Sequence, residues 1–284
     1  MPSLNDLLYI NDLRKYFPVK KTFREIFRFN NQHYTKAVDG ISFEVQKGKV
    51  FVLAGESGSG KTTVARLILR AIEPDSGSII FDGDDITKKT NKQLKKVRTN
   101  IQMVYQDPYT SLNPRMKILE IVMEPLNVNN KDSSKAERTE KVLETLEDVR
   151  LKPAEEISEK FPHMLSGGQR QRVALARSLV LKPKLIIADE PVSMLDVSVR
   201  AEILELMGNL KDRFTVSYLY ITHDLSTARY IGDDIAIMRE GKIAEIGNID
   251  QVLLHPTHPY TQALIEAVSD PETNNLRRER KINS

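Results

Sequence analysis

The chain contains no cysteine among its 284 residues, which excludes disulfide bonds, thiolate zinc sites and cysteine-ligated iron–sulfur clusters. It has no apolar run long enough to span a membrane, and its N-terminus, MPSLNDLLYINDL, does not have the pattern of a signal peptide. The net charge is only +3, too small for a strongly basic nucleic-acid binder. We therefore expect a cytoplasmic protein that binds no nucleic acid.

The remaining composition is that of an ordinary soluble globular protein, with 40% hydrophobic and 29% charged residues. A length of 284 residues suits one large α/β domain plus an appendage. Function must therefore be inferred from local motifs rather than from overall composition.

The central motif is residues 55–63, GESGSGKTT, which match G-x-x-x-x-G-K-[ST], the phosphate-binding loop of nucleotide-hydrolysing proteins. An apolar run precedes it at 50–54 and a helical pattern follows at 62–71, so a glycine-rich turn before an ordinary helix is the weaker reading. Its glycines let the backbone curl and aim successive N–H groups at phosphate oxygens. We expect nucleotide contacts from the whole motif: Gly55, Glu56, Ser57, Gly58, Ser59, Gly60, Lys61, Thr62 and Thr63.

Two residues of the motif, and two beyond it, have the chemistry of phosphoryl transfer. Lys61 supplies a mobile cation for the β- and γ-phosphates, and the Thr62 hydroxyl can ligate Mg²⁺. Asp189 and Glu190 follow a short apolar strand at 185–188, where a surface acidic pair fits poorly. Adjacent carboxylates at a strand end are the expected Mg²⁺ partner and water-orienting group of a phosphate-loop hydrolase.

Gln106 and His223 follow two further predicted strands, at 101–105 and 218–221. A glutamine at a strand end near a phosphate loop can reach the metal or its water. Either residue alone proves nothing, because a lone histidine is more often structural. Their position on the side where the other motifs collect favours a role at the same site.

The N-terminal region contains a candidate adenine contact. An aromatic residue ahead of the first nucleotide strand can stack on the base, and we choose Phe17, with Tyr16 as the second choice. Core packing or a membrane-facing surface is the alternative.

Residues 7–13 predict an edge strand and residues 38–45 a second strand. Residues 19–36 form a basic insertion that could face anionic lipid or a partner, or could be a solvated loop.

A second anion-binding helix start is predicted within the sequence LSGGQRQR. Residues 112–165 before it are mainly helical by pattern, with charges that suit a solvated face. Ser166 is a natural N-cap for the helix that follows, and two glycines let the backbone approach an anion. A merely capped helix would have the same pattern.

Taken in order, GESGSGKTT, Gln106, LSGGQRQR, LIIADEP and His223 resemble the ATP-binding subunit of an ABC transporter over about residues 5–270. QDPYTSLNPR and HPYTQALIEA look like the oligopeptide and dipeptide importer subfamily, and the basic insertion and cysteine-free tail look like its second, F-type ATPase. Met194 departs from the more usual small residue, from which we expect only a packing difference.

The resemblance implies an α/β fold: a phosphate-loop NTPase core with a mainly parallel sheet, an antiparallel β subdomain, an α-helical subdomain and a short C-terminal extension. It implies an ATPase domain at 1–254, with its helical part at about 107–180, and an extension at 255–284.

The resemblance also implies a role for each site residue. Glu190 is the general base that positions the attacking water, and His223 meets the γ-phosphate. Asp189 and Thr62 hold Mg²⁺, directly or through water, and Gln106 senses the metal.

The implied cofactors are ATP and Mg²⁺, at the cytoplasmic face of the cell membrane. The implied partners are two transmembrane permease subunits, a second homologous ATPase in a head-to-tail dimer and, indirectly, an extracytoplasmic solute-binding protein. The partner ATPase's nucleotide would be contacted by three residues of this chain: Ser166, Gly168 and Gln169.

Other classes of protein fit less well. Soluble ABC ATPases of DNA repair or translation usually carry two ATPase units or a coiled-coil insertion, and neither a second phosphate loop nor heptads are present. A non-catalytic regulatory subunit would show damage at Lys61, Glu190 or His223, and a transporter complete in one chain needs spanning segments. The sequence does not specify the cargo, so oligosaccharide or nickel import stays an alternative to peptide import.

Overall fold

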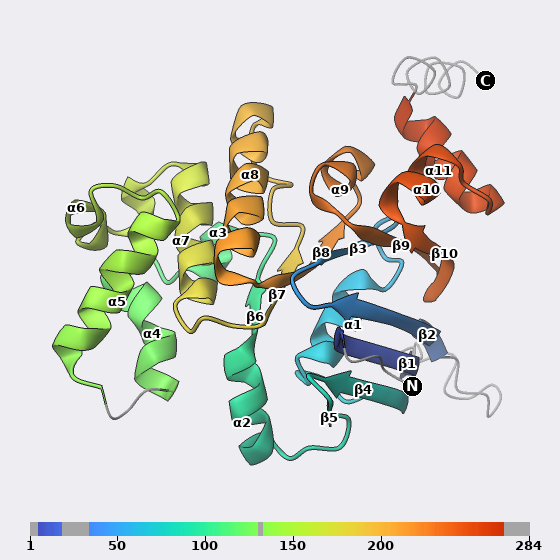
Figure 1. Cartoon of the computed structure of the whole chain (residues 1–284), viewed down its shortest axis with the longest axis horizontal. Coiled ribbons are helices and arrows are strands. Elements are labelled where there is room, and N and C mark those ends of the chain that lie inside the picture. The colour runs from blue at the N-terminus through green and yellow to red at the C-terminus, as the bar shows by residue number, and fades with distance from the viewer. Residues whose placement is uncertain (1–4, 19–33, 130–132, 270–284) are drawn as a thin grey trace, which may run out of the picture.

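The structure, a computed structural model, describes residues 5–18, 34–129 and 133–269. A parallel sheet runs through the centre, with an antiparallel sheet on one side and a group of helices on the other (Figure 1). Most of the predicted basic insertion at 19–36, and the charged tail after residue 269, lie outside the described residues.

The central sheet has the strand order β10-β9-β3-β8-β7-β6. Every neighbouring pair from β9 to β6 is parallel, and only β10 runs antiparallel, as a hairpin with β9. The strands are β3 (Val50–Ala54), β6 (Ile101–Val104), β7 (Leu185–Asp189), β8 (Ser217–Thr222), β9 (Asp234–Arg239) and β10 (Lys242–Asn248).

Both faces of the inner strands β3, β7 and β8 are buried, which explains why these strands are largely apolar runs. In β3, Phe51 and Leu53 join one hydrophobic core while Val52 and Ala54 join the other. Side chains alternate across a strand, so β3 holds the two cores together. The phosphate-binding loop therefore begins from a strand that is fixed on both sides.

The second sheet is antiparallel, in the order β2-β1-β4-β5, and packs over α1 (Lys61–Ile68). Its strands are β1 (Asp6–Pro18), β2 (Tyr34–Gln46), β4 (Ser76–Phe81) and β5 (Asp84–Asp85). The prediction of an edge strand at 7–13 was wrong, because β1 lies between β2 and β4 and hydrogen-bonds to both. Leu8, Ile10 and Leu13 are fully buried, as a central strand requires.

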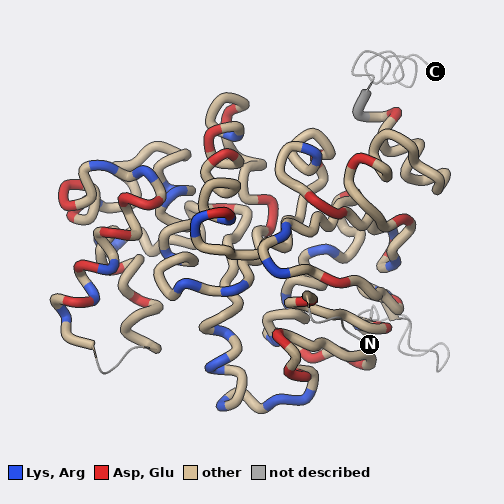
Figure 2. The backbone as a smooth tube through the Cα atoms, in the orientation of Figure 1, with Lys and Arg blue, Asp and Glu red and all other residues tan. Residues whose placement is uncertain are grey.

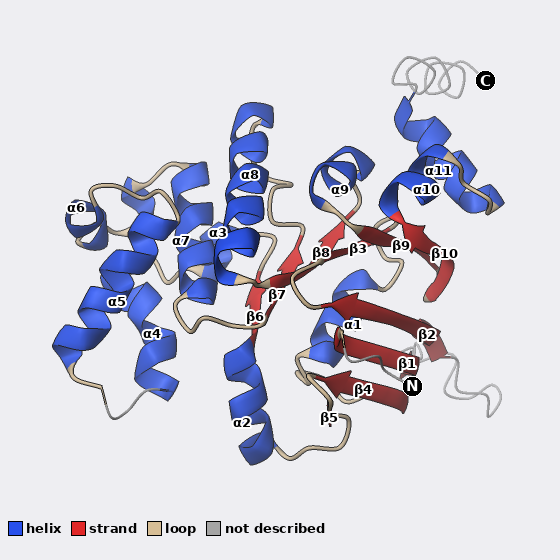
Figure 3. Ribbon diagram, viewed as in Figure 1, coloured by secondary structure: helices blue, strands red, loops and turns tan. Residues whose placement is uncertain are grey.

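The helical group next to β6 and β7 consists of mutually packed helices (Figure 3). They are α3 (Pro108–Ser111), α4 (Ile118–Asn129), α5 (Lys135–Asp148), α6 (Ala154–Ser158) and α7 (Gly167–Leu179). Remaining helices are α2 (Asn91–Asn100), α8 (Val197–Phe214), α9 (Leu225–Ile231), α10 (Ile249–Leu254) and α11 (Pro259–Ser269). Within the described ranges, no helix is both long and apolar enough to cross a membrane.

Helix α2 was not anticipated, because its sequence has no apolar face of ordinary width. Leu94 is its only buried residue, and lysines and an arginine are spread along it (Figure 2). A capping box supports the helix instead: Gln93 at the third position accepts a hydrogen bond from the backbone N–H of Thr90 at 2.9 Å.

The parallel arrangement brings the polar motifs to one edge of the central sheet. β3, β6, β7 and β8 point the same way, so their carboxyl ends lie side by side. The phosphate loop follows β3, Gln106 follows β6, Glu190 follows β7 and His223 follows β8. This is the edge at which open α/β sheets bind their ligands.

Candidate functional site

The phosphate loop has a backbone that only glycine can adopt at two tightly packed positions. Gly55 has φ 148° and Gly60 has φ 110°, both in the left-handed region. A Cβ at Gly55 would lie 2.1 Å from the carbonyl oxygen of Met238, and one at Gly60 would lie 2.1 Å from that of Ala37. The loop is therefore held against β9 and β2, and its conformation depends on these two glycines.

Lys61 extends back across the loop that precedes it. Its ammonium donates hydrogen bonds of 2.7 Å to the carbonyl oxygens of both Gly55 and Glu56, and the residue is only 5% exposed. Burial lowers the pKa of the Lys61 ammonium, while the carboxylates of Glu190 and Asp189 oppose that shift. A cation held between the loop and two acidic residues is well placed to meet phosphate oxygens.

Thr62 and Asp189 meet although 127 positions separate them in the chain. The Thr62 hydroxyl donates a hydrogen bond of 3.0 Å to Asp189 Oδ2, and burial raises the pKa of the Asp189 carboxyl. These two oxygen donors fit Mg²⁺, which is usually bound by one or two protein oxygens together with waters and substrate phosphates. The described residues contain no group of three or more acidic or histidine side chains that could hold a metal alone.

Glu190 contacts two other predicted site residues, Gln106 and His223. Gln106 donates a hydrogen bond of 3.0 Å from Nε2 to Glu190 Oε2, and His223 Nδ1 lies 3.0 Å from Glu190 Oε1. Glu190 itself has φ 48°, an unusual conformation for a residue with a side chain. Its backbone N–H donates to the carbonyl of Ile221 at 2.9 Å, which anchors the turn to β8. Gln106, Glu190 and His223 therefore form one group of polar side chains in direct contact.

This group and the phosphate loop open into one cavity of about 950 Å³, called here the nucleotide pocket. Seven loop residues line it together with Gln106, Glu190 and His223, whereas Gly55 and Ser59 do not line it. Six further lining residues, which the nucleotide-binding motifs did not indicate, come from β2, the β9–β10 turn and α11: Thr35, Lys36, Ala37, Glu240, Gly241 and Leu264.

The two aromatic candidates at the end of β1 have different surroundings. Tyr16 donates a hydrogen bond to Asp39, and Lys36 Nζ lies 5.6 Å from its ring centroid, so its side chain is already engaged. Phe17 is 39% exposed and does not line the nucleotide pocket. It pairs with Thr35 across β1 and β2, however, and Thr35 does line the pocket. Lys15 Nζ lies 5.7 Å from the Phe17 ring centroid, so each ring faces a lysine, and Tyr16 alone of the two also has a hydrogen bond from its side chain.

The LSGGQ segment begins α7 as predicted, and it has no residue in the nucleotide pocket. Ser166 is the N-cap: its hydroxyl accepts from Gln169 N at 3.2 Å, and its own N–H donates to Gln169 Oε1 at 2.9 Å. Ser166 is exposed, whereas Gly168 is buried, and a Cβ on Gly168 would lie 2.6 Å from Val199 Cγ1. The exposed start of α7 is available to a ligand outside this chain's own pocket.

Together these residues can promote hydrolysis of a phosphoanhydride, mainly by positioning the reacting groups and neutralising charge. Loop N–H groups and Lys61 neutralise phosphate charge, Thr62 and Asp189 offer oxygen ligands to a cation, and Glu190 can orient a water. The position of Gln106 and His223 on the two oxygens of Glu190 holds that carboxylate in one orientation.

Comparison with known proteins agrees with this chemistry. Residues 38–193 match the family model described as ABC transporter. The chain is 46% identical over 274 residues to the dipeptide transport ATP-binding protein DppF of Haemophilus influenzae, covering 96% of this chain and 81% of that protein. It is 45% identical to the oligopeptide transport ATP-binding protein AppF of Bacillus subtilis, covering 92% and 78%.

Solved structures lead to the same family. A post-hydrolysis dimer of the ATP-binding cassette MJ0796, bound to ADP and Pi, matches with a TM-score of 0.74 at 27% identity, covering 85% of this chain and 98% of that one. An ADP-bound cassette of an ABC transporter, MJ1267, matches with a TM-score of 0.73 at 28% identity, covering 92% and 99%. The chain therefore belongs to the ABC transporter family, as one of its ATP-binding proteins that hydrolyse ATP.

Proposed function

We propose that the chain is the motor subunit of an importer for dipeptides or oligopeptides. The observation that carries this proposal is the group of Gln106 and His223 on Glu190, beside a complete phosphate loop. Relatives at 44–47% identity are named as dipeptide or oligopeptide transport ATP-binding proteins or as a putative peptide import ATP-binding protein, which supports the class of cargo.

In the proposed mechanism, the phosphate loop and Lys61 bind the triphosphate. Thr62 and Asp189 hold Mg²⁺, which when bound neutralises charge on the β- and γ-phosphates. Glu190 orients the attacking water and accepts its proton. His223 contacts the γ-phosphate, and Gln106 links the pocket to the helical group that comes after it in the chain.

We propose further that two ATPase subunits pair head to tail. Ser166, Gly168 and Gln169 then face the ATP held by the neighbour's phosphate loop. The separation of α7's start from this chain's own nucleotide pocket supports that arrangement, since one chain does not bring both features to one ligand. Two solved structures of one similar cassette, MJ0796, are described as dimeric.

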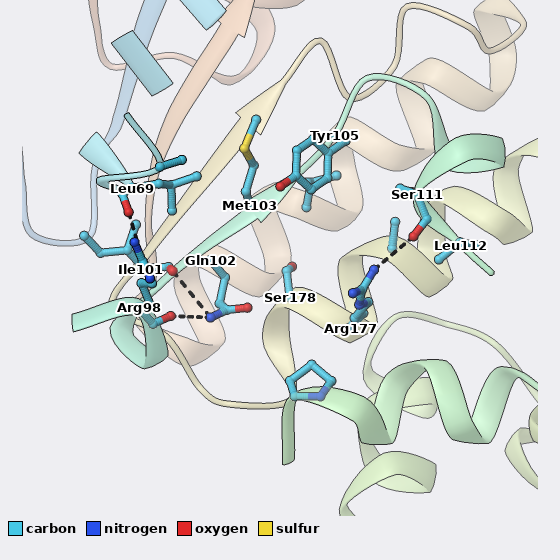
Figure 4. A pocket seen from close by; sticks show the side chains of 14 residues that line it. Leu69, Arg98, Ile101, Gln102, Met103, Tyr105, Ser111, Leu112, Arg177 and Ser178 are labelled. Atoms are coloured by element: carbon cyan, nitrogen blue, oxygen red, sulfur yellow. Dashed lines mark hydrogen bonds between the residues drawn. The ribbon is translucent and has the colours of Figure 1, made fainter. Parts of the chain in front are cut away.

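A pocket between the central sheet and the helical group is the proposed docking site for a permease segment (Figure 4). Its volume is about 320 Å³, and it lies between β6 and the helices α2, α4 and α7. Arg98 donates to the carbonyl oxygens of Leu69 and Arg70 on one side, and Arg177 donates to that of Ser111 on the other. The side chain of Tyr105, the residue before Gln106, lines the pocket and is 52% exposed.

Tyr105, which lines this pocket, is followed in the chain by Gln106, whose side chain donates a hydrogen bond to Glu190. A permease segment bound in the pocket would therefore contact the residue next to Gln106. In the proposed assembly, two permeases hold the ATPase pair at the cytoplasmic face of the membrane, and a solute-binding protein acts from the other side.

The proposed ATPase domain comprises residues 1–254, with a helical subdomain at about 107–180, and residues 255–284 form the extension.

The test of the docking site is Tyr105→Glu in a complex reconstituted into proteoliposomes. We expect it to remove stimulation of ATP hydrolysis by the permeases and to preserve nucleotide binding, because a charge opposes an apolar contact. The matched control is Tyr230→Glu, since Tyr230 is 59% exposed on α9 and does not line the pocket. Equal effects of the two variants would contradict the assignment.

The test of cargo uses the same proteoliposomes with the solute-binding protein and the normal chain. Peptides should stimulate ATP hydrolysis and enter the vesicles, whereas vesicles with Glu190→Gln should take up none. Stimulation by an oligosaccharide or nickel, with no response to peptides, would replace the proposed cargo but leave the motor role intact.

A further inference from the structure

The C-terminal helix α11 lies against the phosphate loop. A second cavity, of about 430 Å³, separates them and is lined on one side by loop residues 56–59 and on the other by Tyr260, Leu264 and their neighbours on α11. Leu264 lines the nucleotide pocket as well. A residue beyond the predicted ATPase domain thus forms part of the wall around the candidate ATP site.

The connection before α11 is held in place by a residue of β10. Glu245 accepts hydrogen bonds of 2.8 Å from both the N–H and the hydroxyl of Thr257, and one of 3.2 Å from the N–H of His258. His258 Nδ1 in turn accepts from the N–H of Tyr260 at 3.1 Å, which satisfies a backbone donor in the first turn of α11. The helix is therefore fixed relative to the core sheet.

The first turn of α11 is also packed against the core. Tyr260 is 9% exposed, and the guanidinium carbon of Arg239 at the end of β9 lies 4.8 Å from its ring centroid. Tyr260 and Glu56, the second residue of the phosphate loop, both line the second cavity. Burial raises the pKa of the Tyr260 hydroxyl, and the nearby carboxylate of Glu56 adds to that shift. Contacts from both β9 and the loop thus position Leu264 one turn further along.

We propose that α11 forms one wall of the ATP site and that the side chain of Leu264, on that wall, increases the affinity for nucleotide. The inference rests on the proposed assignment of the nucleotide pocket to ATP. An aliphatic side chain at this place excludes water from one side of the pocket. Water exclusion strengthens the attraction between phosphate oxygens and the cations around them, Lys61 above all.

The test is a change of charge sign at Leu264 in the full-length protein, with ATP affinity measured by calorimetry. Leu264→Glu should weaken binding by about tenfold at low salt, because the carboxylate repels the phosphates, and the loss should shrink at high salt. Leu264→Lys should bind ATP more tightly than Leu264→Glu by a still larger factor. Leu264→Ala should also weaken ATP binding, because a smaller side chain admits water beside the phosphates.

Leu254→Glu and Leu254→Lys are the matched controls. Leu254 is also a partly exposed leucine, on α10, and it lines neither cavity. Both controls should bind ATP normally. Equal affinities of the Glu and Lys variants at Leu264 would overturn the proposal, and so would equal effects at Leu254.

A Lys61→Ala measurement separates this inference from the function on which it rests. Loss of ATP binding in Lys61→Ala together with no effect of charge at Leu264 would reject only the role of α11. Normal ATP binding in Lys61→Ala would instead reject the assignment of the nucleotide pocket itself.

Discussion

Thr62 donates a hydrogen bond of 3.0 Å to Asp189, which joins the first turn of α1 to the carboxyl end of β7. Both residues carry oxygen atoms of the kind that Mg²⁺ prefers, and they meet although one is on a helix and the other at the end of a strand. The contact therefore brings together the two proposed Mg²⁺ ligands beside the phosphate loop.

The first prediction concerns this pair. Thr62→Ala removes one ligand, so half-maximal ATPase activity should need about tenfold more Mg²⁺. Thr62→Ser keeps the hydroxyl and is the control, with a Mg²⁺ requirement close to normal. A Mg²⁺ titration of the steady-state rate decides the matter, and identical curves for all three proteins would exclude Thr62 as a ligand.

Lys61→Ala should weaken ATP binding roughly 10- to 100-fold, since hydrogen bonds to charged groups are among the strongest in proteins. Calorimetry measures the affinity directly. Because Lys61 also holds the carbonyl oxygens of Gly55 and Glu56, thermal unfolding should be followed in parallel. ATP binding of normal affinity in a folded variant would contradict the assigned contact.

Phe17 and Tyr16 can be separated by two substitutions. Phe17→Ala should lower the affinity for ATP by about tenfold if its ring stacks on adenine, since stacking of a base on an aromatic ring contributes about 1–3 kcal/mol. Tyr16→Phe removes only the hydroxyl bonded to Asp39 and should leave affinity unchanged. The proposed stacking fails if Phe17→Ala binds ATP and a base-free triphosphate with the same relative affinity as the normal chain.

The head-to-tail arrangement is tested at the exposed N-cap Ser166. Aspartate and asparagine both cap helices as well as serine does, so Ser166→Asp and Ser166→Asn differ only in charge. Gly168 is less suitable, because a side chain there would collide with Val199. The aspartate should repel the neighbour's γ-phosphate and reduce hydrolysis at that site by about tenfold or more, whereas the asparagine should not.

Each Ser166 variant is combined with Glu190→Gln in the same chain and mixed with a normal ATPase partner. Turnover then reports only the partner's phosphate loop. Full activity with Ser166→Asp would show that the start of α7 does not serve a neighbouring nucleotide.

The polar site was predictable from sequence because each motif comes directly after an apolar run. Parallel strands bring the residues at their carboxyl ends to one edge of the sheet, so Gln106, Glu190 and His223 could be grouped before their contacts were known. The N-cap role of Ser166 was predictable for a similar reason, since capping depends on residues three positions apart. A structural feature can be predicted from a short stretch of sequence when the interactions that cause it lie within that stretch.

Other features depend on contacts between distant segments. The apolar run at 7–13 predicted a strand there, but such a run carries no information on lateral order, and the expected edge strand lies inside its sheet. Lys36 and Leu264 line the nucleotide pocket only because β2 and α11 approach the phosphate loop in space. Lys36 stands in no motif, and HPYTQALIEA, which contains Leu264, gives no indication of the segment against which it packs.

The most direct test of the whole account is Glu190→Gln, which keeps the size of the side chain and one accepting oxygen but removes the base. ATP affinity and steady-state turnover are measured on the same preparation with Mg²⁺ present. The account predicts normal affinity and a turnover lowered by a factor on the order of 10² to 10⁴. Near-normal turnover, with ATP bound as before, would contradict it.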